Sequence, residues 1–305
     1  FAYHFLTTGG TTLSAGLEAS GADSANFLNL MKNGDGSNNI VSVISGLGWG
    51  LGYFGMPHIL VRFMAVRDEK EMTKSKATAI SWVALSLGFA VFIGTLGRAY
   101  LPELVNGNNE KVFIEMIKKV FTVEMRAPFI AGLFLCGILA AIMSTADSQL
   151  LVSASSVAED IFKGLLKKDA DDKTVMNVSR VTVLVVAVLA YIIAWNPNNT
   201  VMGLVSNAWA GLGAAFGPLV VMSLYWKRTN FPGAVAGIVT GALAVIIWDY
   251  IPLVGGQTLG KATGLYSLVV GFGLGLIAII AVSLATKAPS EEMLQEFEDV
   301  KANRL

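Results

Sequence analysis

The feature that most constrains the fold of this chain is a series of seven long apolar stretches. Each has roughly 20 residues, the length that a helix needs to cross a bilayer. They cover about Ile40–Met64, Thr78–Tyr100, Pro128–Ala154, Val178–Ala194, Val201–Trp226, Gly233–Ile251 and Leu265–Leu284. Charged residues make up 14% of the chain, against about 25% in a soluble domain. The sequence therefore predicts an all-α polytopic membrane protein with a lipid bilayer as its surroundings.

Net charge and the rare residues exclude several classes of protein. The formal net charge is zero, so nothing points to a nucleic-acid partner. Cys136 is the one cysteine, which excludes an internal disulfide and a cysteine-rich metal centre. The two histidines, His4 and His58, are too few for a histidine-based zinc or haem site. No pattern in the sequence specifies an oligomeric state.

The distribution of basic residues predicts the orientation in the membrane. The loops after the first, third and fifth apolar stretches are basic, so we expect them to face the cytoplasm. Residues 1–39 then form an extracellular segment, and residues 287–305 form a cytoplasmic tail. The opening "FAYHFLTTGG" is typical of the end of a helix, so we expect a further part of the protein to precede it.

Two segments outside the apolar stretches are expected to be helical. Within the long loop 101–127, "NEKVFIEMIKKVF" places apolar residues at helical spacing and predicts an amphipathic helix on the outer surface. The acidic segment "PSEEMLQEFEDVKANRL" predicts a solvated helix in the tail.

The sequence of the first apolar stretch does not favour an uninterrupted membrane-spanning helix. Its sequence "SGLGWGLGYFGMPHILVRF" has glycine at positions 46, 48, 50, 52 and 55, followed by Pro57. In a helix interior each glycine costs about 1 kcal/mol and proline about 3 kcal/mol relative to alanine. Unwound backbone at membrane depth is tolerated where it lines a cavity, and transporters use its freed carbonyls as ligands. Trp49 and Tyr53 share one face beside this break. The alternative is close helix packing through the glycines, with the aromatic rings as filler.

The third apolar stretch ends in "AAIMSTADSQLLVSASS". This segment contains several hydroxyl side chains and one carboxylate, which is unusual for a helix buried in a membrane. Ala141, Ser144, Thr145 and Ser148 fall on one helical face. Hydroxyl and carbonyl oxygens suit a small hard cation, so this face predicts a Na⁺ site. The alternative is that these hydroxyls bond back to carbonyls one turn earlier, as is common in membrane helices.

Asp147 lies beyond the edge of the hydroxyl face. An intramembrane carboxylate is a functional candidate, but Asp147 is near the cytoplasmic end of its helix, where it could be hydrated or paired with a basic loop residue. In the fifth stretch, Asn207 and Trp209 are further candidates for the transport pathway. The G-x-x-x-G spacings in the last three stretches favour tight helix packing.

Three long motifs in order carry a resemblance to a known family. They are "GWGLGYFGMPHILVRFMA", "ILAAIMSTADSQLLVSASSVAEDI" and "GLVSNAWAGLGAAFGP". Together they resemble the sodium:solute symporter family, and most of all its proline-carrying members. The resemblance runs from about Val41 to the "KAPS" at the start of the tail.

The resemblance implies a fold and a set of ligands. The fold is the leucine-transporter type, with residues 40–226 as the second of two inverted five-helix repeats and residues 227–286 as two additional helices. Sodium would contact Ala141, Ser144 and Thr145, and the solute would contact Trp49, Tyr53 and Pro57. The implied function is sodium-coupled symport of a small solute, most of all L-proline, across the bacterial inner membrane.

Alternatives remain at two levels. Met56, Asp147 and Ser148 depart from the pattern of proline carriers, which leaves pantothenate, sialic acid and similar solutes open. A membrane sensor domain with a transporter-like fold belongs to another functional class. An intramembrane protease with Ser144 as nucleophile and His58 as base is disfavoured, because nothing around Ser144 resembles an oxyanion loop.

Overall fold

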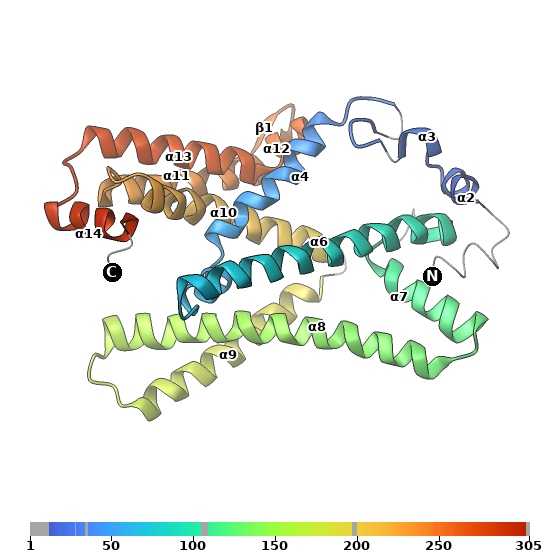
Figure 1. Ribbon diagram of the computed structural model, residues 1–305, viewed down its shortest axis with the longest axis horizontal. Helices are drawn as coiled ribbons and strands as arrows, with labels where there is room; N and C mark the ends of the chain where they lie inside the picture. The colour runs from blue at the N-terminus through green and yellow to red at the C-terminus, as the bar shows by residue number, and fades with distance from the viewer. Residues whose placement is uncertain (1–11, 28, 34–35, 105–108, 197–199, 303–305) are drawn as a thin grey trace. The chain divides into compact units, whose positions relative to one another are not determined.

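The computed structural model describes residues 12–27, 29–33, 36–104, 109–196 and 200–302 (Figure 1). The chain divides into two compact units. One contains the described parts of Phe1–Ser37 and Val66–Thr200, and the other contains Asn38–Ala65 and Val201–Leu305 up to residue 302. The helix end predicted at the start of the chain lies outside the described residues.

The first unit is built from short helices and three long ones. Its α-helices are α2 (Leu13–Ala19), α3 (Ser24–Phe27), α6 (Glu69–Tyr100), α7 (Val112–Ile117), α8 (Pro128–Ser155) and α9 (Asp172–Ala194). Short 3-10 turns cover Pro102–Leu104 and Asn109–Lys111, and π-helical segments cover Lys118–Glu124 and Ser156–Leu166. The last of these prolongs α8 to a continuous helix of 39 residues.

The larger of the two buried clusters in the described part of the first unit lies around the C-terminal end of α6. It consists of Leu17, Ala22, Leu96, Ala99, Leu101 and Met116. Gly16 lets α2 approach α6 closely, since a Cβ at Gly16 would lie 2.8 Å from the carbonyl oxygen of Ala99. The helix predicted in the 101–127 loop is confirmed as α7, with Met116 and Ile117 buried. This segment is therefore packed and is not a free loop.

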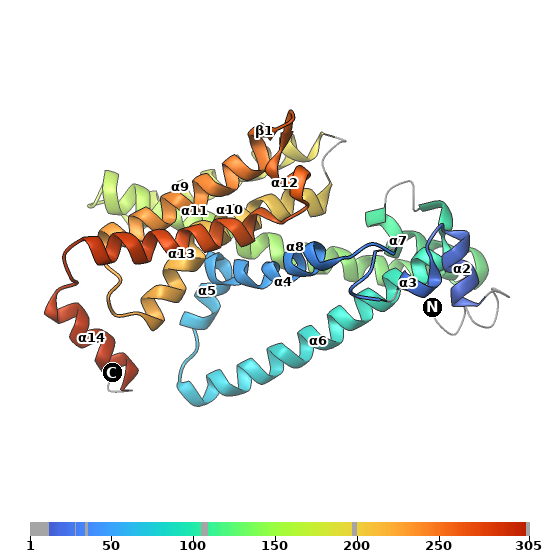
Figure 2. The same cartoon turned by 90° about the horizontal axis from the view of Figure 1, so that it is seen from above.

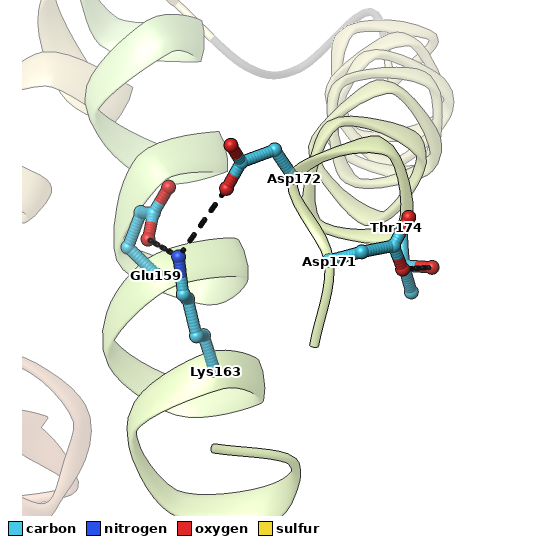
Figure 3. A network of polar contacts seen from close by, with 5 residues as sticks. All are labelled: Glu159, Lys163, Asp171, Asp172 and Thr174. Atoms are coloured by element: carbon cyan, nitrogen blue, oxygen red, sulfur yellow. Dashed lines mark hydrogen bonds and ion pairs between the residues drawn. The ribbon is translucent and has the colours of Figure 1, made fainter. Parts of the chain in front are cut away.

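A polar network joins the end of the α8 extension to the start of α9 (Figure 3). The Lys163 ammonium lies 3.6 Å from an Asp172 carboxylate oxygen and 4.0 Å from one of Glu159. Thr174 donates its hydroxyl to Asp171 at 2.5 Å, and this bond lowers the pKa of the Asp171 carboxyl. Exposed ion pairs contribute about 0–1 kcal/mol, so the network orients the turn more than it stabilises the unit.

The second unit contains α4 (Ile40–Gly52), a 3-10 turn (Tyr53–Gly55), α5 (Pro57–Met64), α10 (Val201–Tyr225), α11 (Phe231–Tyr250), α12 (Leu259–Thr263), α13 (Ser267–Ala285) and α14 (Glu291–Lys301). In this unit a broken helix packs against α10 and α13, and α11 packs against these two helices (Figure 2). A small antiparallel hairpin of β1 (Pro252–Val254) and β2 (Gln257–Thr258) follows α11. Gly255 and Gly256 form its turn with φ of 54° and 79°, which glycine adopts freely.

Glycines bring α10, α11 and α13 into close contact. A Cβ at Gly241 of α11 would lie 2.0 Å from the Ala214 carbonyl oxygen of α10. A Cβ at Gly271 of α13 would lie 2.7 Å from the Ala214 methyl group. The tight packing predicted from the G-x-x-x-G spacings is therefore confirmed. The tail helix predicted from the acidic segment is also confirmed, as α14.

Among the described residues, six helices are long and apolar enough to cross a membrane, or seven with the bent pair 40–64 counted as one span. This agrees with the sequence prediction, but some helices are longer than predicted. Helix α6 begins at Glu69 and not at Thr78, because Asp68 caps it by accepting a hydrogen bond from the Glu71 N–H at 2.9 Å. Hydropathy marks the apolar part of a helix, whereas helix-forming charged residues continue it into water. The inverted-repeat relation and the domain limits drawn from it stay predictions.

Candidate functional site

The break predicted in the first apolar stretch is confirmed. Helix α4 ends at Gly52, and the two halves of the span bend by 58°. Met56 adopts an extended conformation, with φ −91° and ψ 111°, as expected for a residue before proline. Pro57 then occupies the first turn of α5, where its missing N–H leaves no hydrogen bond unmade. The sequence thus ends one helix and starts the next at a defined point.

The glycines of the broken helix fall into two groups. A Cβ at Gly52 would lie 2.0 Å from the Trp209 indole nitrogen, and a Cβ at Gly55 would lie 2.5 Å from the Leu212 carbonyl oxygen. These two glycines therefore permit close contact with α10, as the packing alternative predicts. A Cβ at Gly46 or Gly50 would meet no atom within 4 Å among the described residues. One face of the break is packed, and the opposite face is open.

An aromatic cluster lies on the packed side of the break. The Trp209 ring of α10 stacks on Trp49, with centroids 6.0 Å apart, and meets Tyr53 edge-on at 4.9 Å. The Trp209 indole N–H donates to the Trp49 carbonyl at 3.0 Å. That carbonyl belongs to the last turn of α4, which a 3-10 turn follows directly. Trp209, a pathway candidate from the sequence, therefore binds the last turn of the helix before the break.

The predicted solute residues differ in their exposure. Trp49 is half-buried within the cluster, whereas Tyr53 is 52% exposed and Pro57 is also exposed. Asn207 lies on α10 and is exposed. The structure thus brings Trp49, Tyr53 and Trp209 together and leaves Tyr53 and Pro57 accessible.

Tyr266, which precedes α13, joins the aromatic cluster although no sequence motif indicates it. Its ring stacks on Trp49 with centroids 5.4 Å apart and an interplanar angle of 16°. The only local signal was an aromatic residue at the end of an apolar stretch, which is also typical of a membrane interface.

The hydroxyls of α8 bond back to carbonyls one turn earlier. Thr145 donates to the Ala141 carbonyl at 3.2 Å, and Ser148 donates to the Ser144 carbonyl at 3.0 Å. The back-bonding predicted as the alternative therefore occurs. Each of these oxygens keeps lone pairs that a cation can use.

Asp147 is exposed on α8, and its carboxylate has no hydrogen-bond or ion-pair partner among the described residues. The pairing with a basic loop residue considered for it is not formed there. The sodium candidates belong to the first unit and the solute candidates to the second.

Comparison with known proteins places the chain in a family. Residues 4–241 match the sodium:solute symporter family. The chain is 45% identical over 271 residues to the sodium/proline symporter of Escherichia coli, covering 87% of the chain and 51% of that relative. It is 41% identical over 263 residues to the high-affinity proline transporter PutP of Bacillus subtilis, covering 86% of the chain and 53% of that relative. The chain thus spans about half the length of the curated relatives it matches. No solved structure matches it.

The range matched by the family contains both the sodium candidates and the solute candidates. It includes the broken helix, the hydroxyl face of α8 and Trp209 of α10. The relatives are transporters, not enzymes, and the seven candidate spans agree with a multi-pass membrane protein. The chain belongs to the sodium:solute symporter family.

Proposed function

We propose that this chain takes part in sodium-coupled symport of L-proline across the bacterial inner membrane. The observation that carries the proposal is the broken helix of the second unit. Gly50, Tyr53 and Pro57 are exposed beside the break, and Trp209 of α10 holds the last turn of α4 next to them. Proline is favoured as the solute because the relatives described above are a sodium/proline symporter and a proline transporter.

The open face suits a small zwitterion with an apolar ring. Glycine lets a ligand approach the helix backbone, because no side chain stands between them. Exposed Tyr53 offers both an apolar ring and a hydroxyl, and Pro57 offers an apolar surface. The solute would bind beside the break, and alternating access would then expose it to the cytoplasm.

The proposed sodium ligands are Ala141, Ser144 and Thr145 of α8. The Ala141 carbonyl and Thr145 hydroxyl oxygens lie 3.2 Å apart. A cation of similar size, Ca²⁺, takes oxygen ligands at about 2.3–2.6 Å, so one ion can contact both oxygens at once. The back-bond orients the Thr145 hydroxyl while its lone pairs remain available, which reconciles it with ion binding.

Transport of radiolabelled proline tests the proposal in the full-length native protein that carries this sequence. We expect uptake that requires a Na⁺ gradient and is reduced by excess unlabelled proline. Tyr53→Ala should raise the solute KM about tenfold, the scale of an aromatic contact and a hydrogen bond together. Tyr225→Ala, which truncates an 81% exposed tyrosine at the end of α10, is the matched control.

Three outcomes would contradict parts of this proposal. Proline uptake that does not depend on a Na⁺ gradient would contradict sodium coupling. Competition by pantothenate or sialic acid in place of proline would change the solute. An unaltered KM in Tyr53→Ala, at normal expression, would make Tyr53 a packing residue.

The proposed orientation places the 101–127 segment outside and the turn between α8 and α9 inside, with the C-terminus cytoplasmic. Single cysteines at Asn109 and Lys168 in a Cys136→Ser background test it, because both native residues are exposed. An impermeant thiol reagent added to intact cells should label the Asn109 variant and spare the Lys168 variant until the membrane is opened. Labelling of both in intact cells would overturn the orientation.

A further inference from the structure

Tyr266 contacts three elements of the second unit at once. Its ring stacks on Trp49 of α4, and its hydroxyl donates to the Ser206 carbonyl of α10 at 2.7 Å. Its backbone N–H donates to the Ser45 hydroxyl of α4 at 3.0 Å. The residue itself introduces α13, whose first helical position is Ser267. Tyr266 therefore ties the first half of the broken helix to α10 and to the C-terminal helices.

The backbone that carries Tyr266 is itself fixed by α11. The Trp248 indole N–H donates to the Leu265 carbonyl at 3.0 Å, and Ser267 donates its hydroxyl to Asp249 at 2.5 Å. Gly264 supplies the left-handed turn, with φ of 69°, that ends α12 just before this segment. Both chain neighbours of Tyr266 are therefore hydrogen-bonded to α11, which fixes the backbone from which the ring extends.

The contacts of Tyr266 complement those of Trp209. Trp49 is stacked by both rings, at 6.0 Å from Trp209 and 5.4 Å from Tyr266. The Tyr266 hydroxyl, which is protonated at neutral pH, donates to the Ser206 carbonyl and so links α10 to the same residue. One turn beyond Trp49, Tyr53 remains exposed on the same helix. The position of Tyr53 thus depends on how firmly Trp49 is held.

Under the proposed function, in which Tyr53 contacts the solute, we infer that Tyr266 is a positioning residue for the solute site. It holds Trp49, and through Trp49 the first half of the broken helix, in the arrangement that binds the solute. The two additional C-terminal helices therefore contribute to solute affinity without contacting the solute.

Transport kinetics in the full-length native protein test this role. Tyr266→Leu removes the ring stack and the hydroxyl bond and should raise the proline KM about fivefold to tenfold. The kcat per correctly folded transporter should stay within about twofold, because the change affects binding geometry. Tyr266→Phe keeps the stack and should recover most of the affinity. Tyr225→Leu, at an exposed tyrosine outside the cluster, should match the wild type.

A thiol-labelling measurement gives a readout that does not depend on transport. Ser45 is half-buried beside Tyr266, so a Ser45→Cys reporter in a Cys136→Ser background senses whether this contact opens. Adding Tyr266→Leu should speed labelling by roughly fivefold, the scale of one lost aromatic contact.

The two measurements separate the inference from the function on which it rests. Wild-type protein without sodium-dependent proline uptake would overturn the proposed function, and the labelling rates would still test the contact. A wild-type KM together with unchanged labelling in Tyr266→Leu would overturn the positioning role. A lower expression level with a wild-type KM would make Tyr266 a structural residue only.

Discussion

Gly55→Ala is expected to destabilise the second unit by about 1–3 kcal/mol, the usual cost of overpacking a close contact. The added methyl group would lie 2.5 Å from the Leu212 carbonyl oxygen and 2.7 Å from the Gly213 Cα. Both are backbone atoms, so the clash cannot be relieved by turning a side chain. Either α10 or the break must move, and the Trp209 bond to the Trp49 carbonyl would be lost with it. Thermal unfolding of the purified protein in detergent measures this effect.

Gly50→Ala is the matched substitution on the open face of the same segment. Its methyl group would meet no atom within 4 Å among the described residues, and alanine is the better helix former by about 1 kcal/mol. We expect unchanged or higher stability, combined with a raised solute KM because the methyl group faces the proposed site. Equal stability of the two variants would mean that α10 does not pack against the break as the structure has it.

The broken helix could be predicted because its signals are local. Several glycines and a proline within a short apolar stretch are unfavourable for a regular helix, whatever the rest of the chain does. The extended conformation of Met56 also follows from its neighbour Pro57. What could not be predicted was which glycines pack and which stay open, since that depends on where α10 lies. Gly50 and Gly52 belong to the same glycine-rich motif, but their surroundings differ. A Cβ at Gly52 would lie 2.0 Å from the Trp209 indole nitrogen, whereas a Cβ at Gly50 would meet no atom within 4 Å among the described residues.

Tyr266 shows the limit of sequence analysis most clearly. Its partner Ser45 is 221 positions away in the chain, and the stacked Trp49 is nearly as distant. No periodicity or spacing links such residues, whereas aromatic residues at helix ends are common at membrane interfaces for a different reason. Trp209 could be named as a pathway candidate from the sequence because it lies in a motif with polar and small residues. Its hydrogen bond to the Trp49 carbonyl, by contrast, can be recognised only in the three-dimensional structure.

The hydroxyls of α8 fit both hypotheses about them, because the two roles share one geometry. The bond from Thr145 to the Ala141 carbonyl is the one expected for ordinary back-bonding. The same bond also sets two oxygens at a separation that one small cation can bridge. An ion-dependent measurement distinguishes the two roles.

Thr145→Ala in the full-length native protein should raise the Na⁺ concentration for half-maximal uptake about ten- to hundredfold. Removing one oxygen ligand leaves the lost hydration of the ion less well replaced, and hydrogen bonds to charged groups, at about 1.5–3 kcal/mol, set the scale. At saturating Na⁺ the proline KM should largely recover, because the affinities for the two ligands are linked. Thr145→Ser keeps the hydroxyl and should stay near the wild type.

Ser153→Ala is the matched control for Thr145→Ala on the same helix. Ser153 donates to the Gln149 carbonyl at 2.8 Å, so it loses an equivalent back-bond but no proposed ligand. We expect its Na⁺ dependence to be unchanged. Asp147→Asn separates the carboxylate from the hydroxyls, since an end charge in water can be neutralised without altering the ion site. If Thr145→Ala matched Ser153→Ala in its Na⁺ dependence, α8 would lose its place in the sodium site and its hydroxyls would serve the helix alone.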